Sequence, residues 1–176
     1  MLRNCTKTLG LALLLVLVAA DSDQMCRHLQ ELHNKLQFKQ RVRYMKYYIP
    51  LNYTFKVHYE EIYRIKNTTR LQKQSFTEVD LKILWVYINS QVFKSILQIL
   101  PRKHPSRRYV RSISKLFDYL RMEVRFMVMD LDERVEDIID AVQGKDPESR
   151  RKDIKPKALL DNCYQVMIVL FNCWNT

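Results

Sequence analysis

The chain has 176 residues, a formal net charge of +11, four cysteines and only two glycines. This length suits one domain, and it is enough to bury a substantial core without help from disulfides. Outside the apolar leader the one glycine is Gly144, so the chain has neither a glycine-rich phosphate loop nor a nucleophile elbow, which excludes nucleotide-dependent enzymes and hydrolases of that type.

The chain opens with an apolar leader, in which Arg3 and Lys7 precede an apolar run over residues 9–19 and small residues precede Asp21. This pattern predicts a secretory signal peptide over residues 1–20 and a secreted, extracellular domain over 21–176. The alternative is a membrane anchor. The run is shorter than the roughly 20 residues that span a bilayer and polar residues 21–24 follow it, so we favour the signal peptide and expect no membrane insertion after its removal.

The charge of the predicted mature chain remains strongly positive, because removing Arg3 and Lys7 leaves +9. This balance predicts acidic partners, such as sulfated glycans or an acidic receptor face. Secretion argues against nucleic acid as a partner.

The first predicted element is a helix, since apolar residues keep three-and-four spacing over 25–49 and Pro50 ends the pattern. Over 51–59 apolar and polar residues alternate, which predicts a strand. Ser75 and Glu78 then have the spacing of a capping box before a second helix, whose apolar stripe continues to Pro101.

A third helix begins at Pro105 and keeps a regular apolar stripe as far as residue 131. The rhythm slips there, which predicts a break near Asp130 and a shorter extra helix that ends at Gly144. After a polar stretch over 145–155, the last helix carries two adjacent apolar rows and is predicted to lie in the middle of a bundle.

Connection lengths predict the topology. The four residues 101–104 force the second and third helices to be antiparallel, whereas about 27 residues between the first and second allow those two to be parallel. The connection before the last helix is also long. The predicted fold is therefore all-α, a four-helix up-up-down-down cytokine bundle with long crossovers, an extra helix after the third, and a short β-ribbon in the crossovers.

Cys5 leaves with the predicted signal peptide, so the mature chain has Cys26, Cys163 and Cys173. Along one helix Cys163 and Cys173 would lie about 15 Å apart, beyond the roughly 7 Å limit for bridged α-carbons, so Cys26 must pair with one of them. In the predicted topology the start of the first helix lies beside the end of the last. This favours a Cys26–Cys173 bridge and leaves Cys163 as a buried free thiol.

His28 and His33 lie five residues apart on the first predicted helix and do not share a face, while His58 lies in the predicted strand and His104 in the turn before the third helix, so the four show no catalytic or metal-ligand spacing. We therefore expect neither an enzyme nor a cofactor. After removal of the predicted signal peptide two sequons remain, at Asn52 and Asn67, and they predict N-glycosylation. Asn67 is the better candidate, because Asn52 opens a strand next to a proline.

Basic residues gather in three places, and such clusters predict binding to sulfated proteoglycans. One cluster lies within residues 39–46 of the first helix. The candidate glycan-binding residues belong to the other two, and they are Arg107, Arg108, Arg111, Arg150, Arg151 and Lys152. An ordinary solvated surface is the alternative for any single cluster.

Five blocks of the sequence carry a resemblance. They are RYMKYYIPLNY (43–53), NTTRLQ (67–72), LWV (84–86), HPS (104–106) and KPKALLDNC (155–163). In this order they resemble the interleukin-34 family of short-chain helical cytokines. The resemblance implies a secreted, non-covalent homodimer that binds and dimerises the macrophage colony-stimulating factor receptor, a tyrosine kinase. The implied outcome is survival, proliferation and differentiation of monocytes and macrophages.

The resemblance also assigns roles by position, with Cys26 and Cys173 matching the family's bridge and Asn67 its glycosylated asparagine. It suggests seven receptor-binding residues, which are Lys35, Gln91, Lys94, Leu100, Arg102, Leu116 and Met122. Leu116 and Met122 lie off the predicted core stripe of the third helix. Lys94 and Arg102 are basic where the family has acidic residues, and the chain ends without the family's longer cysteine-bearing tail, so no second disulfide is expected.

Two functions remain open on the sequence. The first is a receptor ligand, and the alternative is a secreted basic glycan-binding or antimicrobial protein that acts by charge. The dependence of binding on salt concentration distinguishes the two functions, because a shape-matched interface survives screening better than one held by charge alone.

Overall fold

The computed structural model describes residues 24–50, 52–125, 127, 131–144 and 150–174. The predicted signal peptide lies outside these residues, and its boundary remains a prediction. The chain begins with an N-terminal helix over residues 24–35. The elements that follow are α2 (Phe38–Val42), a π-helix (Arg43–Tyr47), β1 (Phe55–His58), a 3-10 turn (Tyr59–Glu61), α3 (Ile65–Lys73), α4 (Glu78–Ile99), α5 (Pro105–Arg125), α6 (Glu133–Val142), β2 (Arg151–Ile154) and α7 (Pro156–Leu170).

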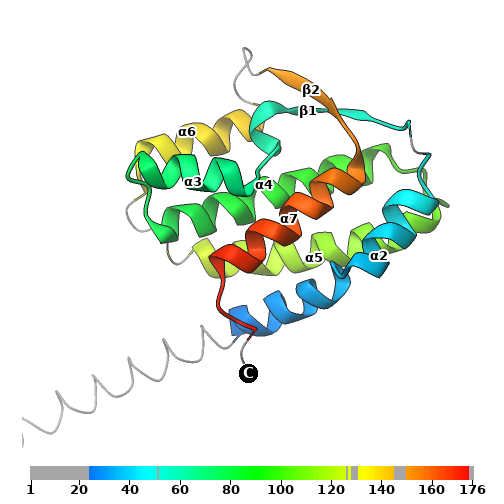
Figure 1. Ribbon diagram of the computed structural model, residues 1–176, viewed down its shortest axis with the longest axis horizontal. Helices are drawn as coiled ribbons and strands as arrows, with labels where there is room; N and C mark the ends of the chain where they lie inside the picture. The colour runs from blue at the N-terminus through cyan, green and yellow to red at the C-terminus, as the bar shows by residue number, and fades with distance from the viewer. Residues whose placement is uncertain (1–23, 51, 126, 128–130, 145–149, 175–176) are drawn as a thin grey trace, which may run out of the picture.

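The architecture is the predicted up-up-down-down bundle. In Figure 1 the N-terminal helix and α4 both run from left to right, whereas α5 and α7 both run back from right to left. The short turn between α4 and α5 makes these two helices antiparallel neighbours, as their spacing in the sequence predicted. The predicted extra helix after the third is α6, which follows a break after Arg125.

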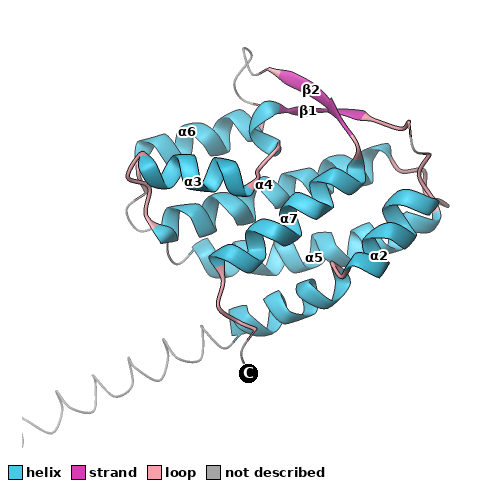
Figure 2. Ribbon diagram, viewed as in Figure 1, coloured by secondary structure: helices cyan, strands magenta, loops and turns pink. Residues whose placement is uncertain are grey.

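A two-stranded ribbon joins the two long crossovers (Figure 2). β1 and β2 are antiparallel, with Phe55 opposite Ile154 and His58 opposite Arg151. Phe55, Val57 and Ile154 are buried beneath the ribbon, so its inner side contributes to the core. The predicted β-ribbon in the crossovers is confirmed, although the first strand is shorter than the predicted 51–59.

The core is centred on Trp85 of α4. The rings of Phe117 and Phe171 each lie 5.1 Å from the Trp85 ring, and Phe93 stacks on Phe117 at 5.3 Å. The indole Nε1 of Trp85 donates a hydrogen bond of 3.1 Å to the carbonyl oxygen of Cys163, which satisfies the one polar atom of this buried side chain. Fully burying each such side chain contributes roughly 1.5–3 kcal/mol.

The helix in the middle of the bundle is α4 rather than α7. Residues 83–86 are all buried, so α4 is covered on every side over this turn, and it contacts α5, α6 and α7. One side of α7 faces solvent, where Ile168 is 37% exposed and Val169 is 55% exposed. The prediction that the last helix lies in the middle of the bundle is therefore wrong. The number of apolar residues does not by itself show which of two apolar helices is surrounded by more neighbours.

The first predicted helix, over 25–49, is not continuous. It breaks at residues 36–37, restarts as α2 and ends as a π-helix. Leu36 is buried and Phe38 is 64% exposed, so the buried face shifts across the break. After the break the buried residues are Arg41, Met45 and Ile49. A buried arginine was not predicted, because the apolar pattern assigns only apolar residues to the buried face.

The first crossover contains a helix that the sequence pattern did not predict, α3, which is short and largely polar. The capping box before α4 also differs from the predicted pair. Ser75 has a positive φ of 67°, and the box is made by Thr77 and Asp80. The Thr77 Oγ1 accepts a hydrogen bond from the Asp80 N–H at 3.1 Å, while the Asp80 carboxylate accepts one from the Thr77 N–H at 2.8 Å.

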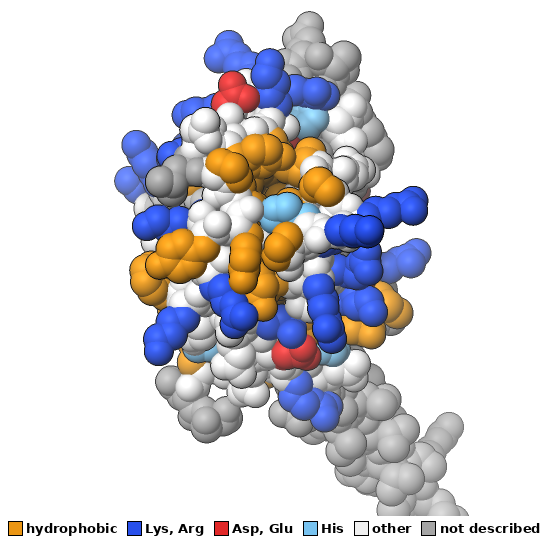
Figure 3. All heavy atoms as spheres, turned by 90° about the vertical axis from the view of Figure 1, so that its right-hand side faces the viewer, with side chains coloured by type: hydrophobic (Ala, Val, Ile, Leu, Met, Phe, Trp, Pro, Cys, Tyr) orange, Lys and Arg blue, Asp and Glu red, His pale blue; other side chains and the backbone are white. Residues whose placement is uncertain are grey.

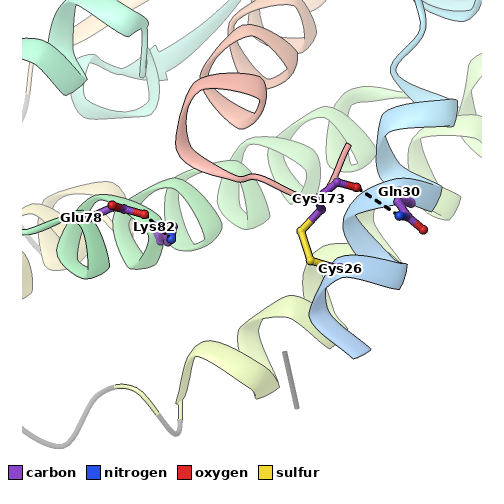
Figure 4. Close-up of a disulfide and its surroundings, with 5 residues drawn as sticks. All are labelled: Cys26, Gln30, Glu78, Lys82 and Cys173. Carbon is purple, nitrogen blue, oxygen red and sulfur yellow. Dashed lines mark hydrogen bonds and ion pairs between the residues drawn. A yellow bond between two sulfur atoms is a disulfide. The ribbon is translucent and has the colours of Figure 1, made fainter. Parts of the chain in front are cut away.

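A disulfide between Cys26 and Cys173 joins the start of the N-terminal helix to the segment after α7 (Figure 4). The amide of Gln30, one turn along the same helix, donates a hydrogen bond of 3.1 Å to the carbonyl oxygen of Cys173. Both links hold the two ends of the described chain together, and the predicted pairing is confirmed. Cys163 is buried and is not disulfide-bonded.

Candidate functional site

Two of the predicted receptor-binding residues, Gln91 and Lys94, line one groove between α4, α5 and the end of α6. The groove has a volume of 230 Å³. Its other lining residues are Tyr87, Arg121, Ile139, Val142 and Gln143. The groove therefore combines polar and cationic groups with an apolar wall, which is the composition that fixes the position of a partner's side chain.

The aromatic and cationic parts of this groove are joined. The guanidinium carbon of Arg121 lies 4.7 Å from the centroid of the Tyr87 ring, a cation–π contact between α5 and α4. Neither Tyr87 nor Arg121 is among the residues predicted from the sequence. Both lie at similar distances in sequence from the turn after Pro101, so the predicted antiparallel pairing of α4 and α5 was a signal that they meet.

Leu100 and Arg102, at the end of α4, differ in their exposure to solvent. Leu100 is buried at 4% exposure, so it is a core residue and offers no surface to a partner. Arg102 is exposed in the turn between α4 and α5. The predicted surface at this end of α4 is therefore narrower than expected.

Arg107, a predicted glycan-binding residue, is occupied within the fold. Its Nη1 donates hydrogen bonds to the carbonyl oxygens of Leu97, at 2.7 Å, and of Leu100. These are carbonyls of the last turn of α4, where a cation both satisfies unpaired acceptors and complements the helix dipole. Arg107 therefore acts as a cap of α4, and its guanidinium is not displayed for a sulfate.

Lys35 and Arg108 were predicted to contact different partners, yet they line the same groove. It has a volume of 560 Å³ and lies between the N-terminal helix, the segment after its break and the start of α5. Tyr44 and Tyr109 form its aromatic wall, with stacked rings 4.4 Å apart. The Tyr109 hydroxyl donates a hydrogen bond of 2.8 Å to the carbonyl oxygen of Lys35, and burial raises the pKa of Tyr109.

Leu116 and Met122 were predicted to lie off the core stripe of α5. Leu116 is buried at 3% exposure, so this placement is wrong, whereas Met122 is 65% exposed. The reason is that α5 packs against α4 and also against the N-terminal helix, whose His28 lies 2.9 Å from Glu123 and whose Lys35 carbonyl accepts the Tyr109 hydroxyl, so more than one row of its residues is buried. Met122 thus remains available to a partner and Leu116 does not.

The remaining predicted glycan-binding residues are exposed, but they lie on separate elements. Arg108 and Arg111 project from α5. Arg150, Arg151 and Lys152 lie in and just before β2, where the carbonyl oxygen of Arg150 accepts a hydrogen bond of 2.8 Å from the Tyr59 N–H. The tertiary structure therefore displays two cationic surfaces rather than a single one.

The two sequons lie in the first crossover. Asn52 is exposed between the π-helix and β1, and Asn67 is half-buried in the first turn of α3. Glycosylation at either position remains a prediction. Within the described residues, no helix has the length and apolar character that crossing a membrane requires.

The class of protein that this fold defines is a helical cytokine. Its signature is the up-up-down-down bundle with two long crossovers, closed by a disulfide between the two ends of the described chain. A family model described as Interleukin 34 matches residues 19–176. The chain belongs to this family and is a cytokine.

Proposed function

We propose that this protein is a secreted ligand of the macrophage colony-stimulating factor receptor and that it acts as a homodimer joining two receptor molecules. Receptor dimerisation would activate the kinase and promote survival, proliferation and differentiation of monocytes and macrophages. The observation that carries the proposal is the match to the Interleukin 34 family over residues 19–176, on a chain with the cytokine bundle topology.

The state of the cysteines supports a non-covalent dimer. Cys26 and Cys173 are bonded to each other, and Cys163 is buried at 1% exposure. Burial also raises the pKa of the Cys163 thiol, which lowers its reactivity because the thiolate is the nucleophile. None of these three cysteines is available for a disulfide between two copies, so contact between subunits would rest on surface complementarity.

The groove lined by Gln91 and Lys94 is the surface that we propose for receptor contact. Tyr87 and Arg121 supply the residue types that dominate binding energy in protein interfaces, and their cation–π contact holds both in place. Ile139 and Val142 of α6 add an apolar wall. A receptor side chain seated there would be shielded from water, which strengthens its polar contacts.

The direct test adds purified protein to matched cells with and without the receptor and measures receptor tyrosine phosphorylation. We expect a dose-dependent signal only in cells that carry the receptor. Gln91→Arg places a third cation in the groove beside Lys94 and Arg121, so the half-maximal dose should rise at least about tenfold, the equivalent of 1.4 kcal/mol. The same substitution at exposed Gln72 of α3 serves as the matched control.

Equal phosphorylation in the two cell lines, or none in either, would rule out this receptor. A normal response of the Gln91→Arg protein would retain the receptor and reject the groove. The two parts of the proposal therefore fail separately.

Sulfated-glycan binding is a second candidate function, favoured by the exposed arginines of α5 and of the segment around β2. The test is elution from a heparin column. Arg150→Glu combined with Arg151→Glu should lower the eluting salt concentration more than the same change of charge on α3, made as Lys66→Glu with Lys73→Glu. Equal shifts for the two pairs would mean that net charge alone governs retention.

A further inference from the structure

The end of the bundle at the right of Figure 1 has an unusual distribution of charge. It contains the π-helix, the turn between α4 and α5, and the start of α7. Two sequence segments that meet there, residues 38–59 and 81–117, contain no aspartate or glutamate at all. Figure 3 faces this end and shows hydrophobic side chains in its middle with lysine and arginine side chains around them.

A pocket of 270 Å³ opens at this end, between the π-helix segment and the first residues of α7. Its apolar wall is formed by Met45, Ile49, Pro50, Tyr53 and Pro156. The pocket is smaller than the roughly 300–1,000 Å³ that drug-sized ligands occupy, so it suits a single side chain.

Three lysines surround the pocket, namely Lys46, Lys155 and Lys157. Lys157 is committed to Asp161, with 2.5 Å between the ammonium nitrogen and the carboxylate oxygen. Lys46 and Lys155 are exposed, and neither forms an ion pair with another residue in the described part of the chain. Two uncompensated ammonium groups therefore stand at the mouth of an apolar cavity.

The wall of the pocket is held in position by the turn between α4 and α5. His104 accepts a hydrogen bond of 3.1 Å from the Ser106 N–H at Nδ1, and its Nε2 lies 3.1 Å from the carbonyl oxygen of Tyr48. The Ser106 hydroxyl donates to the carbonyl oxygen of Tyr44. The segment 44–50 is thus fixed before a partner arrives, which lowers the entropic cost of binding.

We propose that this pocket binds an acidic segment of an extracellular protein, anchored by an aromatic side chain that ends in an anionic ester, the chemistry of sulfotyrosine. The ring would fill the pocket and pack against its apolar wall, and the sulfate would lie between the ammonium groups of Lys46 and Lys155. An aspartate or glutamate is too short to fill the wall, and a purely apolar side chain leaves both lysines without a counter-charge. Acidic residues beside the anchor would face the lysine and arginine side chains that surround this end of the bundle in Figure 3, where opposite potentials speed association and select partners.

The test measures fluorescence anisotropy of three labelled synthetic peptides at physiological ionic strength. They share one aspartate-rich sequence and differ at the central position, which is sulfotyrosine, tyrosine or sulfoserine. The protein carries Asn52→Gln, so that no glycan next to Tyr53 covers the pocket. We expect the sulfotyrosine peptide to bind at least about tenfold more tightly than either of the others, because each of them lacks one of the two contacts.

Charge variants show where the peptide binds. Lys46→Glu with Lys155→Glu should weaken binding of the sulfotyrosine peptide at least about tenfold, as expected when charge-assisted contacts become repulsive. Lys66→Glu with Lys73→Glu makes the same change in net charge at exposed positions of α3 and should have less than a twofold effect. Far-UV circular dichroism checks that both double variants keep their helices.

Three results would overturn the proposal. Equal affinity for the sulfotyrosine and sulfoserine peptides would mean that the apolar wall is not used. Equal weakening by the two pairs of substitutions would mean that net charge alone attracts the peptide. Tighter binding of a sulfated heparin hexasaccharide that depends on Lys46 and Lys155 would assign the surface to a glycan instead.

Discussion

The guanidinium group of Arg41 forms an ion pair with the carboxylate of Asp161, with 2.8 Å between Nε and Oδ1. The same guanidinium donates a hydrogen bond of 2.6 Å from Nη1 to the carbonyl oxygen of Leu36 and lies 4.5 Å from the centroid of the Tyr164 ring. Arg41 therefore joins the break after the N-terminal helix to α7. A residue that reads as part of a basic surface cluster is buried and structural.

Replacing Arg41 should destabilise the fold strongly. Arg41→Met removes the ion pair, leaves the Leu36 carbonyl without this donor and removes one of the two cations beside Asp161, so we expect a loss of about 3–5 kcal/mol in the free energy of unfolding. Urea denaturation at neutral pH measures it. Lys39→Met, at an exposed position of the same helix, should change stability by less than about 0.5 kcal/mol. Similar losses for the two variants would show that the contacts of Arg41 do not stabilise the fold more than an exposed lysine does.

The disulfide should contribute a large part of the stability, because the bridged cysteines are separated by 147 residues. In the chain-entropy description a loop of this size corresponds to about 5 kcal/mol, and we expect the Cys26→Ala/Cys173→Ala protein to lose about 3–5 kcal/mol. Thermal unfolding with and without a reductant provides the internal control. Reductant should lower the Tm of the wild-type protein and leave that of the double variant unchanged. A shift in both would point to another effect of the reductant.

The ionisation of Glu61 should make the protein less stable as the pH rises. Its carboxylate accepts hydrogen bonds from the His58 N–H, at 2.6 Å, and from the Ser95 hydroxyl, at 3.3 Å, but desolvation dominates and raises its pKa above 4.5. The folded protein thus binds this proton more tightly than the unfolded chain does. The resulting stabilisation is fully present below the unfolded pKa and is lost as pH rises through the folded value.

Glu61→Gln isolates this contribution, because glutamine does not titrate. From about pH 4 to about pH 7, the free energy of unfolding of the wild-type protein should fall relative to that of the variant. Denaturant titrations at several pH values measure this difference. The opposite trend would mean that the two hydrogen bonds outweigh desolvation, and a constant difference would mean that the pKa of Glu61 is not raised.

Substitutions at the start of α4 distinguish the observed capping box, made by Thr77 and Asp80, from the predicted one that begins at Ser75. Thr77→Ala should cost about 1 kcal/mol, because the Thr77 hydroxyl accepts a hydrogen bond from the first turn. Ser75→Ala should cost less than about 0.5 kcal/mol, since Ser75 lies outside the box and alanine has the same β-carbon at this positive φ. Chemical denaturation of both variants measures the difference. A larger loss at Ser75 would restore the pair that spacing alone suggested.

Local periodicity and connection lengths allowed much of the fold to be predicted. The stripes of α4 and α5, the break before α6 and the first strand of the ribbon followed from spacing, because these patterns reflect contacts within one element or the geometry of one connection. The Cys26–Cys173 pairing followed from the order of the helices. α3 was missed, since nine mostly polar residues give little apolar period to detect.

The candidate site was predicted less well, because exposure depends on neighbours. Gln91 and Lys94 line a groove, and their contact with a receptor remains a prediction, whereas Leu100 and Leu116 are buried. Arg107 was assigned to a surface, yet the carbonyls at the end of α4 bind its guanidinium. No helical period shows which of several exposed-looking residues a second helix will cover.

By itself, the sequence determined the class of fold, the order and direction of the helices, and the bridge that closes the bundle, because these depend on apolar period and chain length. Only the tertiary structure decided where the first helix breaks and which cations are buried. Arg41 needs Asp161 of α7 beside it, and Lys46 and Lys155 become one site only when the π-helix segment and the start of α7 meet. Such positions are set by partners supplied across the bundle, so no local pattern encodes them.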